Sequence, residues 1–318
     1  MNVKQALNMP QTRPQKSTDE IKASFEEIYL QPDPREYYRV LYGLDYIIPD
    51  LAKGIFRNLV TALERERGRR ITVLDLGCSY GINAALLRLP LDIQRLAQRA
   101  RDLAASGVDT RQILDLDRHY FASWPRSDVR IVGLDVSGPA IAYARSVGLL
   151  DGAVAADLES GTPTPELARM MRDVDLVIST GCVGYVGERT FRQILAACER
   201  PPWVASFVLR MYPYDAIAAA LAERGLGTEK LEGATFVQRR FHSAEECGGV
   251  LEALERQGIS IDGKEAEGLL HAELFLSRPE EDIASVPLDS VATVTSGADH
   301  AFGRRYRLDA DNVIRLAR

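Results

Sequence analysis

The chain has few cysteines, few histidines and no long apolar segment, and each shortage excludes a class of protein. It contains 4 cysteines and 4 histidines in 318 residues. The cysteines lie far apart without C-x-x-C spacing, which argues against a zinc site and a disulfide framework and fits a reducing cytoplasm. The polar N-terminus lacks the apolar core of a signal peptide, and no apolar run could span a membrane. We therefore expect a cytoplasmic protein without a metal site or a membrane partner.

A sustained basic tract is also lacking. The net charge is −6, and acidic and basic residues are mixed along the chain. Nucleic acid is therefore a poor candidate partner, and we expect a small-molecule substrate, with a homodimer left open. The hydrophobic content of 46% is that of an ordinary globular protein, and the length favours one large domain with appendages.

The most informative segment is ITVLDLGCSYGINAALL, at residues 71–87. Its β-branched and apolar start predicts a buried strand, Gly77 and Gly81 predict a tight turn, and the residues from Ile82 predict a helix. A strand, a glycine turn and a helix N-terminus together form the arrangement that holds nucleotide-type ligands at the carboxyl end of a strand.

A dinucleotide-binding turn is the rival interpretation, and two residues argue against it. The G-x-G-x-x-G fingerprint requires glycine where Ser79 stands. Asp75 precedes the first glycine, so its carboxylate would repel a pyrophosphate and attract a ligand that carries an ammonium and a sulfonium. The turn therefore favours a cationic nucleoside, and an ordinary strand–helix turn without a ligand is the remaining alternative.

The pattern Asp75-x-Gly77-x-x-x-Gly81 resembles motif I of the class I S-adenosylmethionine (SAM) methyltransferases. The resemblance implies an α/β, Rossmann-like fold with a seven-stranded, mainly parallel sheet whose last strand is inserted antiparallel. The alternation of strands and helices after the motif agrees with such a sheet. Strands are expected at 71–76, 129–135, 153–156, 174–179, 203–210, 235–241 and 269–276.

The resemblance also implies the residues that hold SAM, as co-substrate or sole substrate. Asp75 would bind the methionine ammonium, and Gly77 and Gly81 would let the ligand approach the backbone without a collision. Asp135 would accept hydrogen bonds from both ribose hydroxyls, unless its segment serves only as a helix N-cap.

Five further residues complete the expected SAM site. Val136 would pack against the adenine edge, Asp157 would accept the adenine amino group, and Leu158 would lie beside the ring; the set also includes Ser79 and Ser179. Asp157 has an alternative role, which is to cap its own turn through Glu159 and the residues after it.

Four segments are expected along the chain. Residues 1–18 resemble a disordered tail, 19–68 an N-terminal helical cap, 69–279 the SAM-binding domain, and 280–318 a C-terminal extension. The domain carries a helical insertion at 89–128, read as a surface helix pair or as a lid or dimerisation element. The extension is read as an added β-hairpin or as an exchanged arm of a dimer.

Tyrosines are concentrated in the cap. Tyr38, Tyr42 and Tyr46 are spaced i, i+4 and i+8, which places them on one face of a helix expected over 36–47. They form either a core stripe or a phenol-lined lid over the sulfonium. The candidate catalytic residues are Tyr38, Tyr42, Ser179 and Tyr185, and the candidates for holding a carboxylate are Arg35, Arg210 and Tyr212.

The loop after the fourth expected strand, residues 179–185, offers no Asp, Glu or His as a general base. Methyl transfer from SAM requires little beyond alignment, so we expect transfer to a small amine, thiol or acidic hydroxyl in secondary metabolism. The long cap and its tyrosines also resemble bacterial SAM-dependent azetidine-2-carboxylate synthases, which implies cyclisation of SAM with release of methylthioadenosine as an alternative. A non-catalytic SAM-binding partner protein is a third interpretation.

Overall fold

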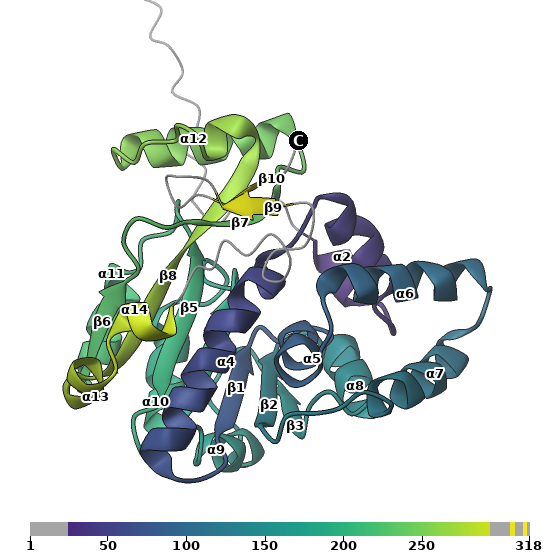
Figure 1. Cartoon of the computed structure of the whole chain (residues 1–318), viewed down its shortest axis with the longest axis horizontal. Coiled ribbons are helices and arrows are strands. Elements are labelled where there is room, and N and C mark those ends of the chain that lie inside the picture. The colour runs from purple at the N-terminus through teal and green to yellow at the C-terminus, as the bar shows by residue number, and fades with distance from the viewer. Residues whose placement is uncertain (1–24, 293–305, 309–313, 317–318) are drawn as a thin grey trace, which may run out of the picture.

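A mainly parallel sheet forms the centre of the computed structural model, which describes residues 25–292 and the strands at 306–308 and 314–316 (Figure 1). The strand order is β3-β2-β1-β4-β5-β8-β6, and β7 also pairs with β8. β8 runs antiparallel to β5, whereas β1 to β5 are parallel. The α/β fold with a late antiparallel strand is therefore confirmed. The strands are β1 (Thr72–Leu76), β2 (Arg130–Asp135), β3 (Gly152–Ala155), β4 (Leu176–Thr180), β5 (Trp203–Leu209), β6 (Leu226–Lys230), β7 (Phe236–Arg240) and β8 (Leu269–Pro279).

Helices cover both faces of the sheet and bury two separate apolar cores. Alternate side chains of the strands point to opposite faces, so Val73 joins one core and Leu74 the other. The first core contains α4 (Ile48–Arg67), α5 (Ile82–Arg88) and α8 (Gly138–Ser146), and the second contains α9 (Pro165–Met171), α10 (Glu188–Ala197), α11 (Asp215–Ala222) and α12 (Ala244–Arg256).

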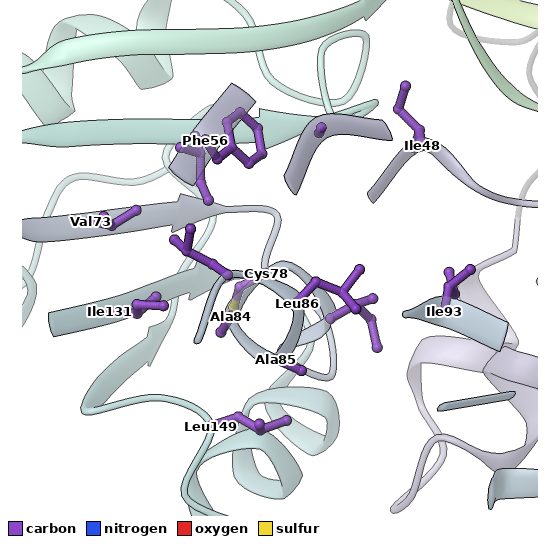
Figure 2. Close-up of a cluster of buried hydrophobic side chains, with 14 of the residues drawn as sticks. Ile48, Phe56, Val73, Cys78, Ala84, Ala85, Leu86, Ile93, Ile131 and Leu149 are labelled. Carbon is purple, nitrogen blue, oxygen red and sulfur yellow. The ribbon is translucent and has the colours of Figure 1, made fainter. Parts of the chain in front are cut away.

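The first core fixes the position of the glycine turn. Figure 2 shows Phe56 of α4 and Val73 of β1 facing the same cluster as Ala84 and Leu86 of α5. Ala84 is fully buried, and its small side chain allows α5 to lie close to the sheet. The N-terminus of α5 is thereby held at the carboxyl ends of the central strands.

The helix expected over 36–47 is confirmed only in part: the chain is helical over residues 35–43, and the helix is irregular and ends earlier than expected. The structure has α2 (Glu26–Tyr29), α3 (Arg35–Tyr37) and then a π-helix, η1 (Tyr38–Tyr42). The backbone N–H of Tyr46 donates to Leu41, five residues earlier, and Asp45 adopts a left-handed φ of 56°. The wider π-turn and this reversal rotate the tyrosines away from a common face.

The insertion forms two helices, α6 (Ile93–Ala105) and α7 (Thr110–Ala122), as the sequence predicts. α6 packs against the π-helix, and α7 packs against α8. The guanidinium of Arg35 donates to the Val108 carbonyl at 3.2 Å, and the Thr110 hydroxyl donates to Asp33 at 2.9 Å. The insertion therefore supports the cap from outside. A role as lid or dimerisation element stays a prediction.

Three elements were missed or left open by the sequence. β6 and α9 were not predicted, because β6 is a half-exposed edge strand without apolar alternation and α9 is short. The C-terminal extension begins with α13 (Glu280–Ser285) and α14 (Leu288–Val291), where the Asn58 amide donates to Val291 at 3.0 Å. β9 (Tyr306–Leu308) and β10 (Ile314–Leu316) pair antiparallel, as the hairpin interpretation expects. The tail at 1–18 lies outside the described residues.

Candidate functional site

The carboxyl ends of β1 and β2 meet at the glycine turn, where the sequence places its ligand. The backbone N–H of Gly77 donates to the Leu134 carbonyl at 2.8 Å. The backbone N–H of Ser79 donates to Oδ2 of Asp135, also at 2.8 Å. These bonds fasten the turn to the end of β2, so Asp75 and Asp135 belong to one site.

The two motif glycines are required by the protein itself. Gly77 and Gly81 have φ values of 73° and 78°, in the left-handed region that favours glycine. A Cβ at Gly77 would lie 2.8 Å from the Cβ of Cys182, and one at Gly81 would lie 3.1 Å from the Cβ of Ala144. The nearest obstacles are therefore side chains of the chain, and the expected role of these glycines toward a ligand stays a prediction.

Asp75 is fully buried, with 0% of its surface exposed, and uses only half of its carboxylate. Oδ1 accepts a hydrogen bond of 3.0 Å from the Asn83 amide, whereas Oδ2 has no partner among the described residues. Burial, opposed by the Asn83 hydrogen bond and aided by the nearby Asp135, raises the pKa of Asp75 to about 7. A buried, unpaired carboxylate oxygen is rare, and a cationic ligand would satisfy it.

Asp135 is held at the end of β2 by backbone donors. Oδ1 accepts from the N–H of Ser137 at 2.8 Å, and Oδ2 accepts from Ser79. Burial raises its pKa in spite of these bonds. The N-cap of α8 is Ser137, so Asp135 does not serve as that cap. Its carboxylate keeps acceptor capacity for hydroxyl groups, and the neighbouring Val136 is 71% exposed.

Asp157 and Leu158 occupy different environments. Asp157 is exposed, and its carboxylate accepts from the N–H of Glu159 at 2.9 Å and from the Ser160 hydroxyl at 2.6 Å. The Ser160 bond, with the Glu159 N–H, lowers the pKa of Asp157. The turn-capping role is thus realised, and the contact with adenine stays a prediction. Leu158 is buried in the core that contains α9 and α10.

Ser179 points to the opposite side of the sheet from Asp75. Val177 belongs to the second core and Ile178 to the first, so the alternation directs Ser179 to the second face and Thr180 to the face of Asp75. Ser179 lies in register with Ser206, while the Thr180 hydroxyl oxygen lies 3.2 Å from the Asn83 amide. The structure therefore brings Thr180, one residue later than predicted, to the acidic end of the site.

Of the three tyrosines in the predicted stripe, the cap brings Tyr46 to the two acids, together with Tyr29 of α2. Tyr46 shares hydrogen bonds with Tyr37 and Thr180, and burial raises its pKa to about 12. Tyr29 lies within electrostatic reach of Tyr46 and Asp135, and burial raises its pKa well above the ordinary value. These phenols stay neutral at physiological pH and face the two acids.

Tyr38 and Tyr42 lie on the insertion side of the cap. Burial raises the pKa of Tyr38, and the charge of Asp117 on α7 adds to this effect. The guanidinium of Arg101, in α6, lies 5.2 Å from the ring of Tyr42. The structure does not bring these two candidate catalytic residues to Asp75.

The site has a closed end and an open end. Asp75 lies at the closed end, because it is fully buried and the nearby Thr180 shares a hydrogen bond with Tyr46 of the cap. Tyr185, in the loop after β4, is 58% exposed, and Val136 and Gly77 are exposed as well. The open end accordingly offers apolar and backbone surface beside Asp135.

The two arginines proposed to hold a carboxylate of the ligand are each paired with an acidic side chain of the protein. Arg35 donates to Asp33 at 2.8 Å, and Arg210 donates to Glu265 at 2.5 Å. Tyr212 packs against Gly184 of the β4 loop. The sequence did not point to a third pair, Arg239 with Glu246, which is buried behind the tyrosines with two hydrogen bonds of 2.8 and 2.5 Å.

The described residues contain neither a metal-binding cluster nor a membrane-spanning helix. No cluster of three or more His, Cys, Asp or Glu side chains there could hold a metal ion. None of the helices within the same residues is both long and apolar enough to cross a membrane.

Several solved structures similar to this chain are SAM-dependent methyltransferases. A TehB-like enzyme from Corynebacterium glutamicum is 14% identical, with a TM-score of 0.35, over 69% of this chain and 86% of that one. The plantazolicin methyltransferase BpumL, in complex with SAH, is 11% identical, with a TM-score of 0.38, over 80% and 93%. The magnesium protoporphyrin IX methyltransferase ChlM from Synechocystis, with bound SAM, is 11% identical, with a TM-score of 0.34, over 70% and 80%.

Comparison of the sequence itself gives no relative. No protein-family model matches the chain, and no curated protein matches it either. The structural resemblances are remote, so the functional conclusion depends on the residues of this chain.

Proposed function

We propose that this protein binds SAM at the carboxyl ends of β1 and β2 and transfers its methyl group to a small-molecule acceptor. The observation that carries the proposal is Oδ2 of Asp75, which is buried beside the glycine turn and has no partner among the residues that the structure describes. A ligand ammonium would pair with this oxygen and remove the penalty of its burial. A pyrophosphate would find a negative charge at the same place.

The remaining contacts follow from the two ends of the site. Asp135 would accept hydrogen bonds from the ribose hydroxyls, and the exposed Val136 would pack against adenine at the open end. Asp157 would receive the adenine amino group through acceptor positions that its turn leaves unused. The rings of Tyr29 and Tyr46 would lie near the sulfonium, where an aromatic face stabilises positive charge.

Methyl transfer requires alignment more than proton transfer. The acceptor's lone pair forms the new bond to the methyl carbon, while the carbon–sulfur electron pair returns to sulfur. The acceptor's proton then leaves to solvent or to a neighbouring group. The cap would exclude water from this displacement. Because the site has few general bases, the favoured acceptors are amines, thiols or acidic hydroxyls. Such groups occur in secondary metabolites.

Cyclisation of SAM is a second candidate, favoured by the same acid. With a pKa of about 7, Asp75 is suited to accept a proton from the α-ammonium of the ligand. The freed amine would attack Cγ, and the Cγ–sulfur pair would leave with methylthioadenosine. The products are methylthioadenosine, azetidine-2-carboxylate and one proton held by Asp75.

One experiment separates these functions. The purified chain is incubated with SAM alone, and then with SAM and a panel of amines, thiols and phenols, and the products are identified by mass spectrometry. Adenosylhomocysteine that forms only with an acceptor supports methyl transfer, whereas methylthioadenosine with a new amino acid from SAM alone supports cyclisation. Binding of SAM without either product supports a non-catalytic partner protein. Calorimetry that detects binding of a nicotinamide dinucleotide but not of SAM would overturn the proposal.

A further inference from the structure

We infer that Asn83 is a positioning residue for the ligand ammonium: it holds one oxygen of Asp75 so that the other oxygen alone faces the ligand. The inference rests on the proposed SAM site and adds a residue that the motif pattern does not include. Asn83 lies in the first turn of α5, where its side chain is 7% exposed.

The geometry restricts both groups. The Asn83 amide nitrogen lies 3.0 Å from Oδ1 of Asp75 and 3.2 Å from the hydroxyl oxygen of Thr180. The Thr180 hydroxyl lies in turn 3.4 Å from Oδ1 of Asn83. Because Thr180 engages both ends of the amide, it fixes the rotation of Asn83, and Asn83 fixes the rotation of Asp75.

This chain of contacts continues into the cap. Tyr46 shares a hydrogen bond with Thr180. The order Asp75, Asn83, Thr180, Tyr46 therefore joins β1, α5, β4 and the cap through side chains alone. A carboxylate held in this way presents Oδ2 in one direction, and a ligand that binds there loses less orientational freedom.

Within the described part of the chain, no cationic side chain contributes to the charge state of Asp75. The titratable groups around this carboxyl are Asp135, the buried Cys78 thiol and the neutral Tyr46 phenol. Arg239 acts electrostatically on Tyr46 and is paired with Glu246. Among the described residues, Asn83 is thus the group that stabilises the charged form of Asp75 directly.

The test measures affinity for adenosylhomocysteine by calorimetry between about pH 5 and pH 8 in the wild type and in Asn83→Ala. Removal of one hydrogen bond should raise the pH at which Asp75 loses its proton by about one unit. The affinity ratio of variant to wild type should therefore fall to roughly one tenth at low pH and recover as the pH rises. Taking the ratio cancels the titration of the ligand itself.

Two more variants complete the test. Thr180→Val keeps the Asp75 contact and frees the Asn83 amide, so it should shift the profile in the same direction by less. Asn58→Ala, an asparagine of α4 that donates to Val291, should leave the profile unchanged. If Asn83→Ala does not fold, the pH dependence of the affinity ratio for Thr180→Val alone tests the inference.

The outcomes distinguish this inference from the proposed function. If the wild type does not bind adenosylhomocysteine or SAM, the proposed function fails. If the wild type binds and the affinity ratios of both variants are independent of pH, the proposed function stands and the positioning role of Asn83 is overturned.

Discussion

The phenol oxygen of Tyr80 lies 2.7 Å from the carbonyl oxygen of Ile28, so the glycine turn donates a hydrogen bond to the cap. The carbonyl of Gln31 lies 2.8 Å from the same phenol. A second fastening comes from α8, where the Ser137 hydroxyl donates to the Tyr29 carbonyl at 2.5 Å. The loops that would bind SAM therefore also hold the segment that encloses it.

Removal of the Tyr80 hydroxyl should loosen the cap without disturbing the core. In Tyr80→Phe, the buried Ile28 carbonyl and the part-buried Gln31 carbonyl lose the one O–H donor that they share, and the free energy of unfolding should fall by about 1–2 kcal/mol. Hydrogen exchange at residues 26–34 should increase. Tyr120→Phe is the matched control, because the described residues give its hydroxyl no hydrogen bond. Equal exchange in the two variants would contradict this account of the cap.

Replacement of Asp75 by Asn should stabilise the unliganded protein at high pH while it abolishes SAM binding. Folding raises the pKa of Asp75 to about 7, above its value in the unfolded chain. The burial penalty is therefore absent below about pH 4 and grows as the pH rises toward 7, to a value on the order of 4 kcal/mol.

Urea unfolding at about pH 4 and pH 8 measures this effect. The gain in stability of Asp75→Asn over the wild type should be small at the lower pH and several kcal/mol at the higher one. The exposed Asp128→Asn serves as control and should show no such trend. A gain that does not depend on pH would mean that Asp75 is not held with a raised pKa.

Truncation of Asp135 should weaken SAM binding by about 2–3 kcal/mol, or roughly 30- to 150-fold in Kd, because a charged acceptor of two hydroxyls is lost. Calorimetry with SAM gives the value directly. Asp173→Ala removes an exposed acid outside the site and should leave the affinity unchanged. Wild-type affinity in Asp135→Ala would discredit the ribose assignment.

We expect the Arg239–Glu246 ion pair to be essential to the stability of the region around the cap tyrosines. Both side chains are 2% exposed, so Arg239→Met would leave the buried Glu246 carboxylate without its cationic partner, at a cost of about 3–5 kcal/mol. The double variant Arg239→Met/Glu246→Met should be more stable than Arg239→Met alone. Denaturant unfolding tests both statements, and Arg192→Met, in an exposed pair with Glu223, should have little effect.

Local patterns in the sequence predicted most of the fold. The strand and glycine turn at 71–81 were predicted from β-branched residues and glycines, and the insertion at 89–128 was predicted to be helical, as α6 and α7 are. β6 could not be found in this way, because Gly227 and its polar neighbours form a strand only through pairing with β8. The long-range pairing of an edge strand leaves no clear periodic signal in its own residues.

The site was predicted less completely than the fold. Asp75 and Asp135 follow from the ends of two strands, but Ser179 was chosen where Thr180 faces the acids. Val177 faces one core and Ile178 the other. Once the two cores are known, this alternation shows which of Ser179 and Thr180 faces the acids. Asn83 was missed because an asparagine in the first turn of a helix resembles any other polar residue there.

The π-helix at Tyr38–Tyr42 separates the cap tyrosines into two groups. Tyr38 and Tyr42 lie on the side of the insertion, and Tyr46 lies beside Thr180. In a regular helix each residue turns the chain by about 100°, so one additional residue within a turn redirects every side chain that follows. Loss of a single residue from this segment would swing Tyr46 away from Thr180 while the composition of the cap stayed nearly the same. In this segment, an insertion or a deletion would therefore disturb the site more than a substitution would.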